Sequence, residues 1–289
     1  MSRAVSVESI GDGLSRTRGA DVDIAFRMRG AGPAVVLLHG TSANHAVWEP
    51  VGDALEDRST VIALDQRGHG RSDKPSHGQP GGGYAGDDFV SDVITVLDAL
   101  GLDQALVAGH SLGGRNAWLA AARHPSRVTG AVVVDYTPFV EASVLDQLDE
   151  RVALGFRPFG SPAEIEQYLR ERYPAILPGA VQRRAAWGYE QVGDGEWMPR
   201  ASASAMAQLI DGFRTPYDRE FREVPVPMTH LRGAESKLVS EAAWKQAMAL
   251  RPADSHPADR WIEVAGADHY IPEEQPELVA AEIALALGV

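Results

Sequence analysis

A serine stands between two glycines in the segment Gly109-His110-Ser111-Leu112-Gly113, directly after a run of apolar residues. This spacing is typical of a sharp turn between a buried strand and a helix, where only glycine fits two residues either side of the serine. Such a turn holds the hydroxyl clear of the sheet and aims the first N–H groups of the helix at it. We therefore predict that Ser111 is a nucleophile and that the amide of Leu112 is a donor to an oxyanion.

The base for this serine is expected to be an imidazole, because its pKa suits proton transfer near neutral pH. The chain has nine histidines. His269 follows the last expected strand and precedes the last expected helix, so its side chain can reach over the sheet edge toward Ser111. His39 and His110 are expected to fill structural positions. The sequence therefore predicts His269 as the general base.

A carboxylate is expected to orient this imidazole. Asp135 ends the apolar run 131–134, where a buried carboxylate requires a cationic or hydrogen-bonding partner. The alternative interpretation is that Asp135 forms a turn ahead of Thr137-Pro138. We predict Asp135 as the acid.

The elements that must carry these residues alternate along the chain. Short apolar runs predict buried strands, and amphipathic segments that end at Gly or Pro predict helices. The predicted strands are 5–10, 22–28, 34–38, 61–64, 105–108, 129–134, 228–232 and 261–264. The predicted helices are 45–55, 87–100, 113–124, 241–250 and 275–287. This alternation implies a mostly parallel sheet with helices on both faces and function at the carboxyl ends of the strands.

The alternation lapses between residues 139 and 224, which are predicted to be an insertion. Prolines break this region into amphipathic helical stretches at 163–172 and 203–213 and a glycine-containing loop at 193–197. Its aromatic side chains suit the roof of an apolar pocket, although they could instead hold the insertion together. Four aromatic residues in or beside the insertion are expected to line the pocket: Tyr136, Phe139, Trp187 and Tyr270. Four arginines could contact a carboxylate on the substrate or form a solvated face: Arg151, Arg157, Arg183 and Arg184.

Four motifs occur in a characteristic order: His39-Gly40, Asp65-x-Arg67-Gly68-x-Gly70-x-Ser72, the turn at Ser111, and Gly266–His269. In this order the chain resembles the α/β-hydrolase family over essentially its whole length. The resemblance implies an α/β fold with a mostly parallel central sheet, a core of residues 1–138 and 225–289, and a helical cap of residues 139–224. It also implies that the backbone N–H of Thr41 is the second oxyanion donor. Asp65 and Arg67 are expected to form a structural, salt-bridged loop.

The acid departs from the commonest pattern of that family. The family usually carries Gly-x-x-Asp after the strand before the last, where this chain reads Gly233-Ala234-Glu235-Ser236. Glu235 lies one residue early and is the alternative acid, unless it is a solvated partner of Lys237. In one branch of the family the acid follows the strand after the nucleophile, which is the position of Asp135 in this chain. This branch includes lactone hydrolases and an enamide hydrolase.

The expected function is that of a serine hydrolase. Through an acyl-enzyme it would cleave an ester, lactone or amide bond of a small, largely apolar molecule. Carbon–carbon bond hydrolysis and cofactor-free perhydrolysis use the same triad and remain alternatives, as does a small-molecule receptor of the same fold. Haloalkane dehalogenases and epoxide hydrolases are disfavoured, since they carry aspartate where this chain has Ser111.

The amino-acid composition limits the kinds of binding partner that the protein is expected to have. The 289 residues include 27 basic and 40 acidic ones, a net charge of −13 that opposes binding to nucleic acid or anionic membranes. There is no cysteine, so no thiolate chemistry is expected. The glycine-rich segment 79–86 is predicted to be a surface loop and not a phosphate cradle. We expect a cytoplasmic protein with a small-molecule substrate, no cofactor and no metal; the oligomeric state is not predicted.

Overall fold

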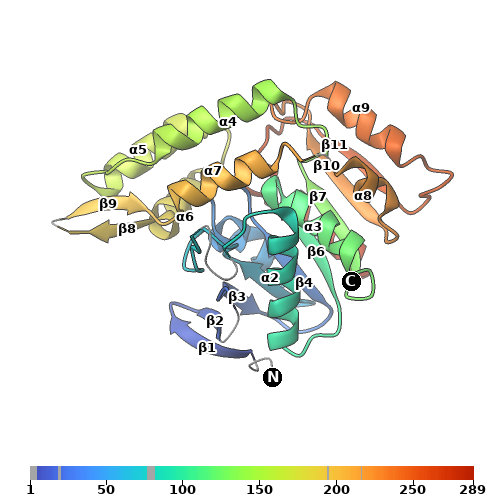
Figure 1. Ribbon diagram of the computed structural model, residues 1–289, viewed down its shortest axis with the longest axis horizontal. Coiled ribbons are helices and arrows are strands. Elements are labelled where there is room, and N and C mark those ends of the chain that lie inside the picture. The colour runs from blue at the N-terminus through green and yellow to red at the C-terminus, as the bar shows by residue number, and fades with distance from the viewer. Residues whose placement is uncertain (1–4, 19–20, 77–81, 194, 216) are drawn as a thin grey trace.

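The computed structural model describes residues 5–18, 21–76, 82–193, 195–215 and 217–289 (Figure 1). A nine-stranded sheet forms its centre, in the lateral order β1-β2-β3-β5-β4-β6-β7-β10-β11. These strands are β1 (Ser6–Gly11), β2 (Leu14–Arg18), β3 (Ala25–Arg29), β4 (Ala34–Leu38), β5 (Thr60–Leu64), β6 (Ala105–His110), β7 (Val128–Val134), β10 (Met228–Gly233) and β11 (Arg260–Val264).

The sheet is parallel from β5 through β4, β6, β7 and β10 to β11. The first three strands form an antiparallel meander that joins the parallel part where β3 pairs with β5. In the register of the central strands, Val36 of β4 lies opposite Ile62 of β5 and Val107 of β6. The carboxyl ends of neighbouring parallel strands therefore meet at one edge of the sheet, which is where parallel sheets carry their sites.

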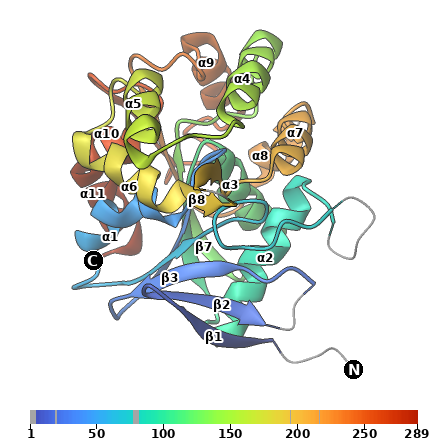
Figure 2. The same ribbon diagram turned by 90° about the vertical axis from the view of Figure 1, so that its left-hand side faces the viewer.

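Both faces of the sheet are buried, as the continuous apolar runs predicted. In β4, Val36 and Leu38 belong to one hydrophobic cluster, and Val35 and Leu37 belong to the cluster on the opposite face. Figure 2 shows α2 on one side of the sheet and α1 with α11 on the other. The helices of the core are the 3₁₀-helix His45–Trp48, α1 (Glu49–Asp53), α2 (Gly86–Ala99), α3 (Leu112–Arg123), α9 (Glu241–Leu250), α10 (Ile271–Glu274) and α11 (Pro276–Leu287).

A group of helices lies over the carboxyl edge of the sheet, at the top of Figure 1. Its helices are α4 (Ala142–Gly155), α5 (Pro162–Arg172), α6 (Pro178–Gly188) and α7 (Ala203–Gly212). The short helix α8 (Asp218–Glu223) instead packs against α3 and α9. The start of α5 follows from local chemistry: Pro162 occupies the first turn, and the Ser161 hydroxyl accepts a hydrogen bond from the N–H of Glu164 at 3.2 Å. The division of the chain into a core and a cap of residues 139–224 stays a prediction.

Several elements differ from the sequence prediction, which contained none of the helices α4, α6, α8 and α10. The strand β2 was not predicted, and the strand expected from residue 22 begins at Ala25. Of the predicted loop 193–197, residues 196 and 197 instead belong to β9 (Glu196–Pro199), which pairs with β8 (Tyr189–Val192) in a two-stranded hairpin. Most of β8 is exposed, so it lacks the apolar alternation by which a strand is recognised. Of the predicted surface loop 79–86, residues 79–81 lie outside the described residues.

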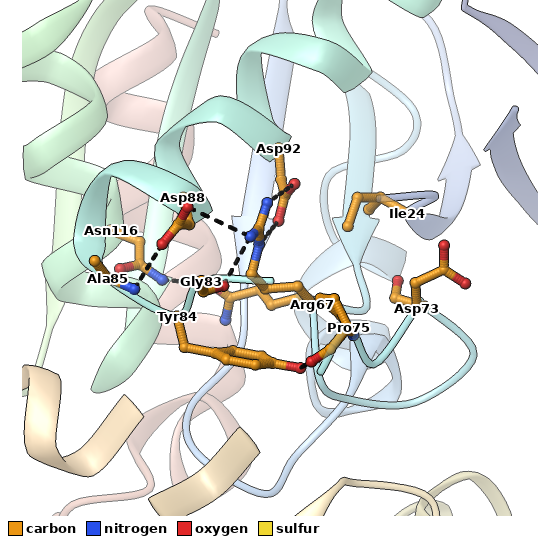
Figure 3. Close-up of polar contacts among 12 residues, drawn as sticks. Ile24, Arg67, Asp73, Pro75, Gly83, Tyr84, Ala85, Asp88, Asp92 and Asn116 are labelled. Carbon is orange, nitrogen blue, oxygen red and sulfur yellow. Dashed lines mark hydrogen bonds and ion pairs between the residues drawn. The ribbon is translucent and has the colours of Figure 1, made fainter. Parts of the chain in front are cut away.

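The loop after β5 is anchored by the buried side chain of Arg67 (Figure 3). Its guanidinium donates to both carboxylate oxygens of Asp92 on α2, at 2.6 and 2.7 Å, and to the carbonyl of Gly83 at 2.8 Å. Burial raises the pKa of Asp92 to about 6, while the hydrogen bonds from Arg67 act in the opposite direction. Asp65 pairs with His45 at 2.8 Å and accepts the N–H of Arg71 at 2.8 Å. Both residues thus have partners that tie the loop to the core.

Candidate active site

The turn between β6 and α3 holds Ser111 in a strained backbone conformation. Its φ is 53°, in the left-handed region that L-residues rarely adopt. A Cβ at Gly109 would lie 2.0 Å from the carbonyl oxygen of Gly113, and a Cβ at Gly113 would lie 2.1 Å from that of Leu38. Both glycines are therefore required by the close approach of strand and helix, as the spacing around Ser111 predicted.

The carboxylate of Asp135, at the end of β7, receives three hydrogen bonds. Its Oδ2 lies 2.6 Å from Nδ1 of His269 and accepts the hydroxyl of Ser236 at 2.6 Å, and its Oδ1 accepts the N–H of Gly233 at 2.9 Å. Burial raises the pKa of Asp135, and the bonds from Ser236 and Gly233 lower it. Burial also lowers the pKa of His269, so its imidazole is neutral and Nδ1 is the atom that donates to Asp135.

Glu235, the alternative acid, lies elsewhere. Its side chain is exposed and its backbone N–H donates to the carbonyl of Ala267 at 3.0 Å. The next residue, Ser236, is buried and reaches the carboxylate of Asp135. The serine that stands where the family commonly has its acid is thus a partner of Asp135, a role that the sequence analysis missed although the position itself was noted.

Ser111 and His269 line the same two cavities. One cavity is shared with Gly40, Thr41 and His110, and no direct hydrogen bond joins the Ser111 hydroxyl to the imidazole. The ring of His110 packs 4.6 Å from that of His269, and its Nε2 bonds to the backbone carbonyl of residue 269 at 2.8 Å. His110 therefore packs against His269 and bonds to its backbone, a structural position as the sequence predicts.

Two backbone N–H groups, those of Thr41 and Leu112, belong to segments that adjoin Ser111. Leu112 is the first residue of α3, so its N–H has no acceptor within the helix. Thr41 follows Gly40, where a Cβ would lie 3.3 Å from the Cβ of Ser111. Within the described part of the chain, neither N–H of this pair is used in another hydrogen bond. They have the chemistry of an oxyanion-binding pair.

The two cavities at Ser111 differ in character. Tyr136 lines the apolar one, together with Val144, Leu148 and Phe213. Tyr270 lines the other, which continues toward Arg184. Of the remaining expected pocket residues, Phe139 packs against the hydrophobic core cluster, and Trp187 lies edge-on to His45 at 4.9 Å beneath the guanidinium of Arg71. Neither Phe139 nor Trp187 lines these two cavities.

Two arginines of the helices α4 and α5, Arg151 and Arg172, line a further cavity and lack a carboxylate partner among the described residues. Arg172 donates to the hydroxyls of Tyr168 at 2.8 Å and Tyr173 at 2.9 Å, and Arg151 lies 3.3 Å from the hydroxyl of Tyr270. Among the described residues neither guanidinium pairs with a carboxylate, whereas Arg184 beside them is paired with Glu273. Both unpaired arginines line the cavity that contains His269 and Tyr270.

Arg151 and Arg184 are two of the four arginines that the sequence indicated, whereas Arg172 was not among them. Of the other two, Arg157 is paired with Glu164 at 2.8 Å on the surface, and Arg183 lines none of the cavities around Ser111. The described residues hold no cluster of three or more His, Asp or Glu side chains arranged to bind a metal ion. They also contain no helix long and apolar enough to cross a membrane.

The fold and these motifs define the class of the protein. A family model described as the alpha/beta hydrolase fold matches residues 33–276, and the chain belongs to this family of hydrolytic enzymes. Among curated proteins, a 2-(acetamidomethylene)succinate hydrolase of Mesorhizobium japonicum is 41% identical over 262 residues, which cover 91% of this chain and 90% of that protein.

Solved structures agree with this assignment. A crystal structure of E-2-(acetamidomethylene)succinate hydrolase superposes with a TM-score of 0.88 at 38% identity, covering 99% of this chain and 100% of the other. A thioesterase domain from the curacin biosynthetic pathway superposes with a TM-score of 0.74 at 20% identity, covering 97% of this chain and 99% of that domain. The second likeness is one of fold alone.

Proposed function

We propose that this hydrolase is a serine enzyme that removes a small acyl group from the nitrogen of an anionic substrate such as 2-(acetamidomethylene)succinate. The observation that carries the proposal is the pair of carboxylate-free arginines, Arg151 and Arg172, at a cavity that His269 also lines. This substrate class is more polar than the largely apolar molecule that the sequence alone predicts.

The reaction starts with the transfer of a proton. Asp135 holds Nδ1–H of His269, which leaves Nε2 as the acceptor for the proton of Ser111. The Oγ of Ser111 then forms a bond to the acyl carbonyl carbon, and the carbonyl electrons move to its oxygen. The N–H groups of Thr41 and Leu112 hold the resulting oxyanion.

Collapse of this tetrahedral intermediate breaks the bond between the acyl carbon and nitrogen. His269 returns its proton to the leaving nitrogen, which departs as an amine, and the acyl group stays on Ser111. Water then attacks the acyl-enzyme while His269 removes its proton, and a carboxylic acid is released. For an acetamido substrate the acyl product is acetate.

Two cavities that His269 lines suit the two halves of such a substrate. The apolar one, walled by Tyr136, Leu148 and Phe213, suits the methyl of an acetyl group. The polar one, which His269 lines but Ser111 does not, carries Arg151 and Arg172 for the carboxylates of the leaving group. Charge-assisted bonds of this kind contribute about 1.5–3 kcal/mol each, enough to select an anionic substrate over a neutral one.

The test is turnover of 2-(acetamidomethylene)succinate, followed by acetate release, with intact-mass measurement of the acyl-enzyme. We expect an acetyl group on Ser111 in the wild type and a loss of turnover of roughly 10⁴-fold or more in Ser111→Ala. The dimethyl ester of the same substrate keeps the amide but lacks both charges. We expect its kcat/KM to be at least roughly tenfold lower. Equal turnover of the diester and the dianion would contradict the proposed substrate class.

A second candidate is a hydrolase of neutral esters or lactones, which the apolar cavity lined by Tyr136 and Phe213 favours. A panel of 4-nitrophenyl esters and small lactones separates the two. A neutral compound with a kcat/KM well above that of the dianionic amide would favour this candidate.

A further inference from the structure

A chain of buried hydrogen bonds runs beneath the candidate oxyanion site and has no part in the proposed reaction. It begins at Arg115, whose Nε donates to Oδ1 of Asn116 at 3.1 Å. Nδ2 of Asn116 donates to Oε1 of Gln66 at 2.7 Å, and Nε2 of Gln66 donates to the carbonyl of His39 at 2.6 Å. All four residues are buried. The chain thus links α3, the loop after β5 and the end of β4.

The direction of this chain is determined by its first residue. A guanidinium can only donate, so the oxygen of Asn116 must face Arg115 and its nitrogen must face Gln66. The nitrogen of Gln66 is therefore the atom that faces His39. Arg115 is fully buried between the rings of Phe89 and Phe213, and its Nη1 and Nη2 have no hydrogen-bond partner among the described residues. Among the described residues, Arg115 therefore joins this series of hydrogen bonds through Nε alone.

The series of hydrogen bonds ends at His39, which lies close in the structure to the two candidate oxyanion donors. The carbonyl of His39 accepts two bonds, one from Gln66 and one from the N–H of Gly113 at 3.2 Å. Nε2 of His39 accepts a hydrogen bond from the backbone N–H of Gln66 at 3.0 Å. Gln66 therefore bonds to both the carbonyl oxygen and the ring of His39. Thr41 lies two residues after His39, and Leu112 lies one residue before Gly113. The carbonyl of His39 therefore joins the segments that carry the two N–H groups.

We propose that Gln66 and Asn116 are positioning residues that set the separation between the N–H groups of Thr41 and Leu112. The inference rests on the proposed function, because it concerns the oxyanion of that reaction. Removal of one oxyanion donor usually lowers turnover by about 10²- to 10³-fold. A donor that is displaced but still present should produce a smaller loss, of roughly 10- to 100-fold.

The first variant is Gln66→Met, which keeps the length of the side chain and removes both bonds made by its amide. We expect kcat for 4-nitrophenyl acetate to fall by roughly 10- to 100-fold with KM within about threefold. Phenylboronic acid forms a tetrahedral adduct with an active serine. Its inhibition constant should rise by the same factor by which kcat falls, whereas a merely structural role would change the melting temperature without this correlation. The matched control is Gln275→Met, which also removes a bond from a glutamine amide to a carbonyl, that of Ala265 at 2.9 Å. The control should keep wild-type kcat.

The second variant is Asn116→Asp, which keeps the shape of the side chain but removes its donor. The aspartate would accept from Arg115 and from Gln66, so the amide of Gln66 must turn its oxygen toward the carbonyl of His39. We expect a loss of kcat similar to that of Gln66→Met. The double variant should be no worse than either single one, because both act through one carbonyl.

The outcomes separate this inference from the proposed function. If Gln66→Met keeps kcat within twofold of the wild type while Ser111→Ala is inactive, only the positioning role is wrong. Additive losses in the double variant would also overturn it, since they require two independent routes. If Ser111→Ala keeps full activity, the serine mechanism fails and the positioning role fails with it.

Discussion

Replacement of Asp135 by asparagine tests the candidate triad most directly. The amide can take either of two orientations. With its nitrogen in place of Oδ1, it would face the N–H of Gly233 at 2.9 Å, which is a contact between two donors. With its nitrogen in place of Oδ2, it would face the hydroxyl of Ser236, which can rotate to accept, and Nδ1 of His269. The second orientation is therefore favoured.

In that orientation Nδ1 of His269 must become the acceptor, so the proton moves to Nε2. An imidazole protonated at Nε2 cannot take the proton of Ser111. By comparison with the same change in other serine triads, we expect kcat to fall by about 10⁴-fold for Asp135→Asn. This equals about 5.5 kcal/mol of transition-state stabilisation. KM should change little, since the carboxylate does not contact the substrate.

The assay is steady-state acetate release by Asp135→Asn at pH 7 to 9, with folding checked by circular dichroism. Glu235→Gln is the matched control and should keep activity within about twofold, because the side chain of Glu235 is exposed. Near-normal turnover in Asp135→Asn together with collapse in Glu235→Gln would refute the assignment of Asp135.

Three further predictions concern pH, stability and specificity. Burial lowers the pKa of His269 below its usual 6.5, so the imidazole stays neutral at pH 7 and its protonation should not limit kcat/KM near 6.5; an acid limb centred near 6.5 that remains in Asp135→Asn would contradict this. Both ring nitrogens of His230 are buried without a hydrogen-bond partner among the described residues, and burial holds its pKa well below 6.5. The unfolded chain therefore binds a proton that the folded chain does not, and the free energy of unfolding falls as pH drops below 6.5. His230→Phe should raise that free energy by about 1 kcal/mol at pH 7 and by more at pH 5, measured by urea denaturation. Arg172→Gln should raise KM for the dianionic amide by roughly 10- to 100-fold and leave 4-nitrophenyl acetate within about threefold, and equal changes for both would argue against carboxylate binding at Arg172.

Local sequence signals were sufficient for the elements of the core. The run 34–38 matches β4 residue for residue, and the amphipathic segment 241–250 matches α9. Both carry a pattern that burial enforces: a strand covered on two faces is apolar throughout, and a packed helix is apolar along one stripe. The short strands β2 and β8 escaped prediction because they are only partly buried. Their residues carry no such pattern.

The turn at Ser111 was also accessible from the sequence. At this turn the strands and the helix α3 approach so closely that no side chain fits at positions 109 and 113. Glycine at both positions is therefore visible in the sequence. The histidine was accessible for a related reason: His269 follows a buried strand, and the carboxyl ends of parallel strands meet at one edge.

The sequence by itself determined the class of fold, the position of the strained turn that carries the candidate nucleophile, and the order of the catalytic candidates, because each of these depends on neighbours along the chain. Only the tertiary structure separated Asp135 from Glu235, since the distance to His269 spans 134 positions in the sequence. Only the tertiary structure places Gln66 beside Asn116, 50 positions away in the sequence. It also places Arg151 and Arg172, which have no carboxylate partner among the described residues, at the cavity that His269 lines. Hydrogen bonds and ion pairs of this kind depend on which side chains folding brings within about 3 Å, and no local pattern of residues records that.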